Sequence, residues 1–404
     1  MTHKGNIFGA TMLVAGTCIG GGMLALPVVT GEAGFFPSLL MICLGWGFMT
    51  LTALYLAEVN LWMGKGAHII TMASRFLGPF GRVVAWLLYL FMGYATLVAY
   101  TAGGSELFQK ALAQLFHLDI SASFAIFLFI FFFGTIVYLG NIVVGRVNNL
   151  LMVGLVVAYL LLVFSGIFYV QGANLLRHHF GGTIMAVPLL LTIFSFQTII
   201  PSLTIYLNQD GRALRRSIIW GTGMALVVYL IWEFLVLGAV PFEGAGGLLS
   251  ALSQGRLSTE CLGIAIGNRW VCLLADFFAF FALVTSFLGI ALGLFDFLAD
   301  GLKIERKKWG KIILGLLVAI PTFLFTLSFE KIFLRALDIT GGVGDAILNG
   351  ILPCLMVWVG RYRENMVSEY RVAGGRFLIL VAIGYATFVF TVEILGKLGV
   401  VVSV

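Results

Sequence analysis

Eleven apolar runs, each about twenty residues or longer, make up most of the sequence, and short charged or turn-forming segments separate them. A helix needs about 20 apolar residues to cross the hydrocarbon core of a bilayer. Only 10% of the 404 residues are charged, whereas soluble domains carry roughly 25%. We therefore expect an all-α membrane protein with a single transmembrane domain over residues 1–400. The expected spans lie near residues 6–30, 36–63, 81–107, 122–142, 147–170, 183–207, 213–239, 270–300, 309–329, 332–360 and 376–398.

The distribution of basic residues predicts the orientation of these spans. Of the 24 Lys and Arg residues, 17 fall in the N-terminal tail and the even-numbered connections, and 7 fall on the opposite side. Because basic loops stay in the cytoplasm, we expect a cytoplasmic N-terminus and an external C-terminus. The net charge of +6 comes from short clusters between apolar runs, so nucleic acid is not an expected partner. The lipid bilayer is the expected surrounding, and the sequence indicates no obligate protein partner.

The first apolar run contains a glycine-rich interruption. Each glycine costs roughly 1 kcal/mol against alanine in a helix, and a bilayer tolerates irregular backbone only where it lines a cavity or is buried in protein. We expect a broken helix, whose free N–H groups suit a carboxylate and whose free carbonyls suit a cation. Close helix packing through Gly16-x-x-x-Gly20 is the alternative interpretation. The candidate substrate-binding residues here are Gly16, Thr17, Ile19, Gly20, Gly21, Gly22 and Met23.

The sixth run has a similar interruption. Ser195, Gln197 and Thr198 place polar groups inside it, and Pro201 follows where it can start or bend a half-helix. Ser195 and Gln197 are therefore candidate substrate contacts. Spans 1 and 6 each lead a set of five, and an odd number of spans inverts the second set relative to the first. We expect a 5+5 inverted repeat, with repeats at about 6–170 and 183–360 and an extra helix at about 376–398.

Aromatic side chains near the two interruptions are further candidate substrate contacts. Tyr94 and Tyr100 of the third span can offer a hydroxyl to a carboxylate, although tyrosine is also common in interfacial belts. Phe194 and Phe196 can stack on an aromatic substrate, although most of the 36 phenylalanines are expected to face lipid or the core. Only their position beside the sixth-span interruption distinguishes these two.

Carboxyl groups inside the spans are candidate sites for a coupling proton, because ionisable groups at bilayer depth are costly without a function. Asp296 and Asp345 rank first and Glu233 next. Each of them could instead be a neutral or paired carboxyl that assists helix packing. Glu58 and Asp300 lie near cytoplasmic ends and are expected to reach water.

Two hydroxyls of the eighth span offer a different coupling site. If Thr285 and Ser286 face the free carbonyls of an unwound first helix, the oxygens form a cage suited to sodium. In the alternative interpretation each hydroxyl bonds back to its own helix.

The sequence gives little support to other chemistry. No His, Cys, Asp or Glu spacing matches a metal site and no nucleophile is paired with a base, so neither metal nor cofactor is expected. Asp296 and Asp300 loosely resemble the Mg²⁺-binding aspartates of prenyl transferases, without a second such motif. A channel would need a filter repeat, which the sequence lacks. Whether Cys261 and Cys272 form a disulfide is left open.

Three segments resemble a known family. They are residues Gly16–Pro27, Thr285–Asp300 and Glu369–Phe377, of which the second is the most specific. The chain resembles the hydroxy/aromatic amino acid permeases nearly from end to end, and within them the tyrosine-specific members. The resemblance implies the leucine-transporter fold of the amino acid–polyamine–cation superfamily. It also implies proton-coupled uptake across a bacterial cytoplasmic membrane.

The chain departs from the family pattern near the expected site. Gln197 stands where the family tends to have histidine and cannot titrate, and Ser195 and Thr198 replace glycines. Glu233 stands where a neutral residue is expected. The resemblance predicts a symporter that imports an aromatic amino acid by alternating access, with tyrosine ranked ahead of tryptophan and phenylalanine. Sodium coupling and an intramembrane Mg²⁺-dependent prenyl transferase are the alternatives.

Overall fold

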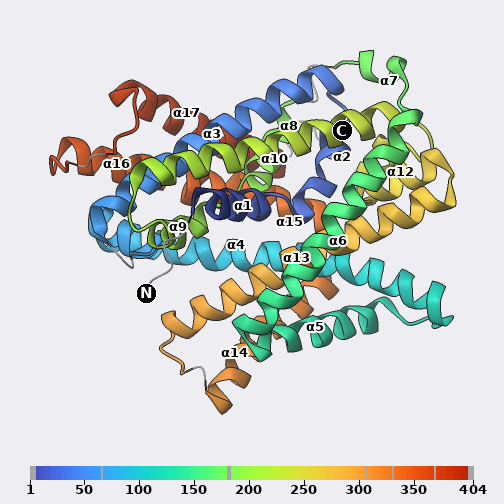
Figure 1. Cartoon of the computed structure of the whole chain (residues 1–404), viewed down its shortest axis with the longest axis horizontal. Coiled ribbons are helices and arrows are strands. Elements are labelled where there is room, and N and C mark those ends of the chain that lie inside the picture. The colour runs from blue at the N-terminus through green and yellow to red at the C-terminus, as the bar shows by residue number, and fades with distance from the viewer. Residues whose placement is uncertain are drawn as a thin grey trace.

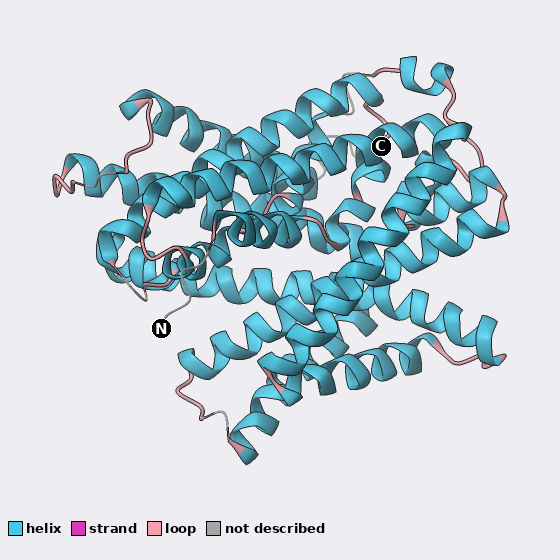
Figure 2. Cartoon of the chain, viewed as in Figure 1, coloured by secondary structure: helices cyan, strands magenta, loops and turns pink. Residues whose placement is uncertain are grey.

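The computed structural model describes residues 6–64, 67–179, 183–305, 307–329, 332–367 and 370–398. Within these ranges the regular structure is helical (Figures 1 and 2). One isolated bridge among the described residues joins Gly34 to His178. Glu369, which begins the third family-like segment, lies outside the described residues. In chain order the elements are α1 (Ile7–Cys18), η1 (Gly21–Leu24), α2 (Leu26–Thr30), α3 (Phe35–Met63), α4 (Ile69–Phe116), α5 (Ala122–Leu139), α6 (Asn141–Gly166), η2 (Ile167–Tyr169), α7 (Gly172–Leu176), α8 (Thr183–Ile193), η4 (Gln197–Ile199), α9 (Ile200–Tyr206), α10 (Gly211–Ala239), α11 (Leu248–Gln254), α12 (Ser258–Ile266), α13 (Arg269–Gly301), α14 (Lys308–Ser328), α15 (Ile332–Ile339), η5 (Thr340–Ile351), α16 (Leu352–Tyr362) and α17 (Gly375–Lys397).

The described helices supply the eleven expected spans. Ten helical segments are long and apolar enough to cross a membrane, and the bent pair formed by α1 and residues Gly21–Thr30 makes an eleventh. Each segment overlaps one of the runs read from the sequence. The third span is longer than expected, because α4 continues from Ile69 to Phe116 through a kink at Gly78, whose φ is +72°. Gly78 tolerates this conformation because it has no Cβ.

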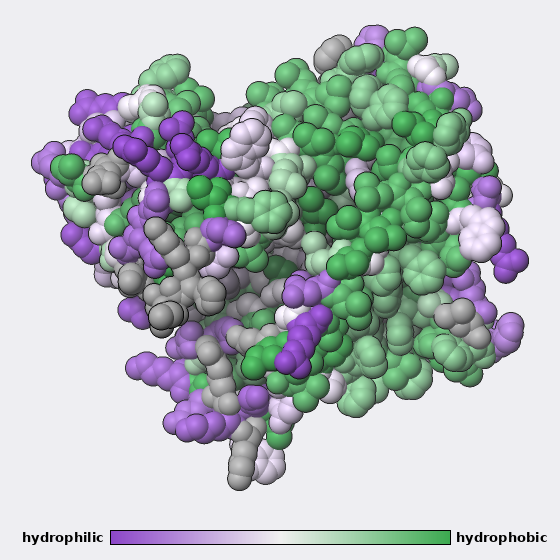
Figure 3. Space-filling view, viewed as in Figure 1, coloured by the Kyte–Doolittle hydropathy of each residue, from purple (hydrophilic) through white to green (hydrophobic). Residues whose placement is uncertain are grey.

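The outer surface of the bundle matches a lipid environment. Large apolar side chains point outward from several spans, for example Phe131 at 65% and Ile142 at 74% exposure. Figure 3 shows hydrophobic residues over much of this face, whereas hydrophilic residues gather at the end that carries the N-terminus and the α16–α17 connection. A broad apolar belt between polar ends is what a bilayer requires of a spanning protein.

The core sits around α1, which lies in the middle of the bundle (Figure 1). It packs along α10, while α13 packs against α4 and α6 on the other side. The tenth span is continuous through α15, η5 and α16, and η5 is a π-helix of 12 residues. A Cβ on Gly341 would collide with the Pro188 carbonyl oxygen, and one on Gly342 would collide with Glu393. Glycine at these positions therefore allows α8 and α17 to approach η5 closely.

Candidate transport site

The first span is broken where the glycine run predicted. α1 ends at Cys18, Gly20 has an extended backbone, and the chain resumes as η1 and α2 with a bend of 43°. The glycines are required by close neighbours, because a Cβ on Gly21 would lie 2.7 Å from the Tyr100 ring and 2.9 Å from Leu283. The prediction of an unwound segment is confirmed, and its glycines also allow close packing, as the alternative proposed.

The sixth span is broken as well. α8 ends at Ile193, residues 194–196 are not helical, and the chain resumes as η4 and α9. Pro201 occupies the first turn of α9, where its missing N–H costs no hydrogen bond. Both the first and the sixth spans are therefore interrupted by residues outside the regular α-helix.

The hydroxyl of Tyr229 joins the two breaks. It lies 2.6 Å from the carbonyl oxygen of Cys18 and 2.8 Å from that of Ile193, so α10 supplies a donor to both broken spans. Trp232, one turn further along α10, donates its indole N–H to the Met23 carbonyl at 3.0 Å. Both side chains are fully buried. Sequence reasoning missed them, although aromatic residues with polar atoms inside a span were the available signal.

A cavity of about 660 Å³ lies between the breaks. It extends along α1 to Gly9 and Met12, and it reaches Asn148 at the start of α6. It therefore runs from the middle of the bundle toward the end where α1 begins, and Figure 3 shows this face hollowed in the region of α1 and α13. Of the predicted site residues, those that line it are Gly16, Thr17, Ile19, Gly20, Gly22, Tyr100, Ser195, Thr285, Ser286 and Asp345.

The backbone of the first break faces this cavity. The N–H of Gly21 donates to the Ser286 hydroxyl oxygen at 3.0 Å, and the Tyr100 hydroxyl also interacts with Ser286. The N–H groups of Gly20 and Gly22 have no hydrogen-bond partner among the described residues. The break thus presents two free donors and two hydroxyls to the cavity.

Several predicted contacts lie elsewhere. Phe194 and Phe196 are fully buried, and Phe194 packs edge-on against Tyr229 rather than lining the cavity. Gln197 donates to the Met49 carbonyl at 3.2 Å and accepts the N–H of Phe196. The Tyr94 hydroxyl donates to the Leu317 carbonyl at 2.6 Å, on the side of α4 that faces α14. Gly21 and Met23 also fall outside the cavity lining.

A polar cluster connects the second break to η5. The Ser195 hydroxyl donates to Asp345 Oδ1 at 2.6 Å, and Asn349 Nδ2 donates to the same oxygen at 2.6 Å. Asp345 and Asn349 are fully buried, and Asp345 lines the cavity. Asp345 was predicted, whereas Asn349 was missed even though it follows Asp345 by one helical turn.

The remaining predicted coupling residues occupy different surroundings. Glu233 lies on the face of α10 that packs against α2, and it is fully buried there, outside the cavity. Its Oε1 atom accepts a hydrogen bond from the Thr30 hydroxyl. Asp296 is partly exposed and acts electrostatically on Tyr89. The Thr285 hydroxyl donates to the Phe281 and Ala282 carbonyls of its own helix.

Glu58 does not reach water as expected. It is 1% exposed and forms a bidentate ion pair with Arg361, which lies far away in the sequence. Asp300, its counterpart in the prediction, is exposed. The prediction for Glu58 is wrong because tertiary packing brings the end of α16 and the following connection over it.

The end of the bundle opposite the cavity opening is covered. The Arg177 guanidinium donates to the Gly31 and Glu32 carbonyls, which follow α2, and lies 3.6 Å from the centroid of the Phe242 ring. Partial burial lowers the pKa of Arg177, and nearby Glu243 and Glu32 oppose that shift. Phe242 belongs to the connection over residues 240–269, and helices α11 and α12 of that connection pack on α2. The connection over residues 240–269 therefore covers this end of the bundle.

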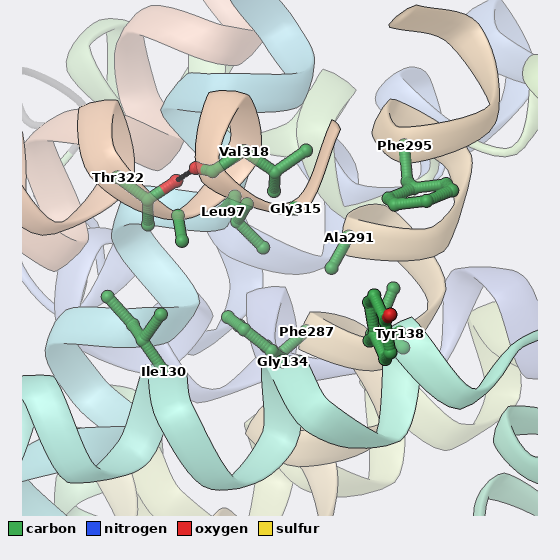
Figure 4. A pocket seen from close by; sticks show the side chains of 12 residues that line it. Leu97, Ile130, Gly134, Tyr138, Phe287, Ala291, Phe295, Gly315, Val318 and Thr322 are labelled. Atoms are coloured by element: carbon green, nitrogen blue, oxygen red, sulfur yellow. Dashed lines mark hydrogen bonds between the residues drawn. The ribbon is translucent and has the colours of Figure 1, made fainter. Parts of the chain in front are cut away.

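A second, much smaller cavity of about 40 Å³ lies between α4, α5, α13 and α14 (Figure 4). Its lining is mostly apolar, and the Thr322 hydroxyl there donates to the Val318 carbonyl of its own helix. A space of this size holds about one water molecule and no amino acid. It is not a candidate transport site.

The described residues contain no group of three or more His, Cys, Asp or Glu side chains able to hold a metal ion. All five cysteines are free, so Cys261 and Cys272 do not form a disulfide. Cys261 lies in α12, outside the spans, where burial raises the pKa of its thiol to about 12. A thiol with so high a pKa is unreactive near neutral pH.

Comparisons with known proteins agree with this geometry. The model of the tryptophan/tyrosine permease family matches residues 3–393. A tryptophan-specific transport protein of Haemophilus influenzae is 30% identical over 406 residues, which cover 98% of this chain and 97% of the relative. The tyrosine-specific transport system 1 of the same organism is 30% identical over 378 residues, covering 93% of each chain.

A solved structure shares the fold. MhsT, crystallised in complex with L-phenylalanine, superposes with a TM-score of 0.67 at 15% sequence identity, covering 96% of this chain and 98% of MhsT. MhsT has the leucine-transporter fold, so the expected fold class is confirmed: eleven spans with a 5+5 inverted repeat and broken helices 1 and 6.

Proposed function

Because this chain belongs to the tryptophan/tyrosine permease family, it transports aromatic amino acids, and we propose that it is a proton symporter. It imports tyrosine, with tryptophan as the second candidate, across a bacterial cytoplasmic membrane by alternating access. Relatives of this chain are named as transport proteins, so the prenyl transferase alternative based on Asp296 and Asp300 is dropped. The single observation that carries the proton proposal is the fully buried carboxyl of Glu233, which lies beside the second half of the broken first span and has no cationic partner among the described residues.

The first break is the proposed binding site for the α-carboxylate of the amino acid substrate. The free N–H groups of Gly20 and Gly22 suit the α-carboxylate, because backbone donors at the start of a half-helix carry partial positive charge. Tyr100 and Ser286 offer hydroxyls beside them. The cavity of about 660 Å³ is within the range of roughly 300–1,000 Å³ that ligand sites occupy.

The surroundings of Glu233 support a protonated carboxyl. The Thr30 hydroxyl has one proton, and it lies 2.7 Å from the Leu26 carbonyl of its own helix as well as close to Glu233 Oε1. Oε2 has no partner, and no Lys, Arg or His in the described part of the chain forms an ion pair with Glu233. An ionised carboxylate left without a partner there would cost several kcal/mol.

The position of Glu233 links the proton to the moving part of the fold. Thr30 ends α2, the second half of the first span, whereas Glu233 belongs to α10 and neighbouring Ser38 to α3. Loss of the proton would leave a negative charge in this apolar contact and favour separation of α2 from α10. The proposed N-terminal orientation makes the present conformation inward-facing, because the cavity extends toward the start of α1.

Uptake into proteoliposomes tests the proposal. Labelled tyrosine is offered with an inward proton gradient in sodium-free buffer, and accumulation that collapses with a protonophore is expected. Glu233→Gln should abolish accumulation while retaining tyrosine exchange, because glutamine keeps the shape but cannot release a proton. Glu305→Gln, which neutralises an exposed loop carboxyl, is the matched control and should behave as the unmodified protein.

Two outcomes would redirect the proposal. Accumulation that requires sodium would move the coupling site to Thr285 and Ser286 and exclude Glu233. No uptake of tyrosine or tryptophan under either gradient would reject the transport assignment itself.

A further inference from the structure

We propose that Asp345, held in place by Ser195 and Asn349, forms a subsite that accepts a hydrogen bond from the ring substituent of the substrate, and that this subsite selects tyrosine and tryptophan over phenylalanine. The inference rests on the proposed function, since it assumes that an aromatic amino acid occupies the central cavity. It assigns to Asp345 a role in specificity rather than in ion coupling.

The donors of this cluster are already used. Ser195 gives its one hydroxyl proton to Asp345 Oδ1, and Asn349 Nδ2 donates to the same oxygen and to Ser195 Oγ, the latter at 3.2 Å. These contacts also fix the Asn349 amide, because a flipped amide would set its oxygen against the Asp345 carboxylate. The amide oxygen therefore points away from Asp345.

Two acceptors remain without a partner. Asp345 Oδ2 and Asn349 Oδ1 are both buried, and neither has a hydrogen-bond partner in the described part of the chain. The Thr192 hydroxyl lies near Asp345, but its one proton goes to the Leu337 carbonyl at 2.8 Å, and Thr340 donates to the Ala336 carbonyl at 2.7 Å. A buried acceptor without a donor is costly, so the cluster is complementary to a ligand that brings a donor.

Two members of the cluster belong to the wall of the cavity, whereas Asn349 is fully buried and does not line it. Asp345 and Ser195 line it together with Leu348 of η5 and Met92 of α4, which supply apolar surface for a ring. A π-helical segment carries both acceptor residues, and such segments frequently occur at functional sites. The break proposed to bind the carboxylate lies between α1 and η1, so the two polar groups of residues in the cavity wall come from different elements.

The chemistry identifies the substrate class. The phenolic O–H of tyrosine and the indole N–H of tryptophan are both donors, whereas the phenylalanine ring has none. Phenylalanine would leave the buried acceptors unpaired after displacing water from the cavity. Sites built to bond a substrate O–H or N–H reject the analogue that lacks it strongly, by factors of up to about 10⁴–10⁵.

Competition experiments on the full-length protein test the subsite. Binding of labelled tyrosine to purified protein is measured against unlabelled tyrosine, tryptophan and phenylalanine, and phenylalanine should compete at least about 100-fold more weakly than the other two. Asn349→Leu should reduce this preference at least about tenfold. Asp276→Asn, which neutralises a partly exposed carboxylate paired with Lys110, should leave it unchanged.

Asp345→Asn provides a sharper readout. Asparagine can keep the acceptor facing Ser195 and place its NH₂ group where Oδ2 lies, so the subsite gains a donor. The indole N–H can only donate and would be repelled, whereas the tyrosine hydroxyl can also accept. We expect tryptophan affinity to fall at least about tenfold more than tyrosine affinity.

The outcomes separate this inference from the proposed function. Equal competition by all three amino acids, or unchanged selectivity in both Asn349→Leu and Asp345→Asn, would overturn the subsite while leaving aromatic transport intact. Loss of proton dependence in Asp345→Asn with unaltered selectivity would reassign Asp345 to coupling. Absence of tyrosine and tryptophan binding in the unmodified protein would reject the proposed function instead.

Discussion

The carboxylate of Glu58 in α3 receives two hydrogen bonds from the guanidinium of Arg361 in α16, at 2.7 Å and 2.5 Å, and both side chains are 2% exposed. Val372, in the α16–α17 connection, completes the arrangement, because its N–H donates to Glu58 at 2.8 Å and its carbonyl accepts from Arg361 at 2.9 Å. The ion pair therefore fastens this connection to the end of α3.

Removing one partner of this pair should be more damaging than removing both. Glu58→Gln leaves Arg361 buried without its counter-charge, and we expect a loss of about 3–5 kcal/mol in the free energy of unfolding. The double variant Glu58→Leu with Arg361→Met should lose less. Thermal unfolding of the detergent-solubilised protein measures both.

The Arg75–Glu364 ion pair provides the control. These side chains are 51% and 29% exposed, so Glu364→Gln should cost at most about 1 kcal/mol. Equal melting temperatures for Glu58→Gln and Glu364→Gln would contradict the structural role given to the buried pair.

Gly21 should tolerate no side chain. Gly21→Ala places a Cβ 2.7 Å from the Tyr100 ring and 2.9 Å from Leu283, so we expect the first break to shift and tyrosine uptake to fall at least about tenfold. Gly134→Ala adds the same methyl group to α5, where nothing lies within 4 Å, and should transport normally. Comparable uptake by the two variants in proteoliposomes would show that close packing at Gly21 is unimportant.

Tyr229 should matter through its hydroxyl alone. Tyr229→Phe keeps the packing against Phe194 but removes the donor to Cys18 and Ile193, with an expected cost of about 1–3 kcal/mol. We expect a lower melting temperature and a several-fold loss of uptake, measured by thermal unfolding and by uptake into proteoliposomes. Tyr169→Phe, which alters a 40% exposed tyrosine of η2, serves as the comparison. If both variants match the unmodified protein, the hydroxyl has no role in holding the breaks.

The breaks were predictable because they depend on local chemistry. Consecutive glycines after Gly16, and a proline following polar residues in the sixth span, disfavour a continuous helix whatever surrounds them. The eleven spans were predictable for a similar reason, since length and hydropathy alone identify them. Asp345 also stood out, because a carboxyl inside a span is rare.

The direction in which a side chain points was not predictable in the same way. Tyr94 and Tyr100 lie on one helix six residues apart and face different neighbours, yet only the packing of α4 decides which of them meets the cavity. Phe194 and Phe196 were expected to stack on substrate because they adjoin a break, but they fill the core instead. The partner of Glu58 is 303 residues away, a distance no local pattern spans.

The single hydroxyl that joins the two breaks has a consequence for how the transporter changes shape. Tyr229 carries one hydrogen atom and faces two carbonyl oxygens, those of Cys18 and Ile193, from different halves of the inverted repeat. One hydrogen atom can satisfy only one oxygen fully at a time. If one of these carbonyls moved away, the Tyr229 hydrogen could still bond the other, so the hydroxyl would stay attached to one broken span while the other moves.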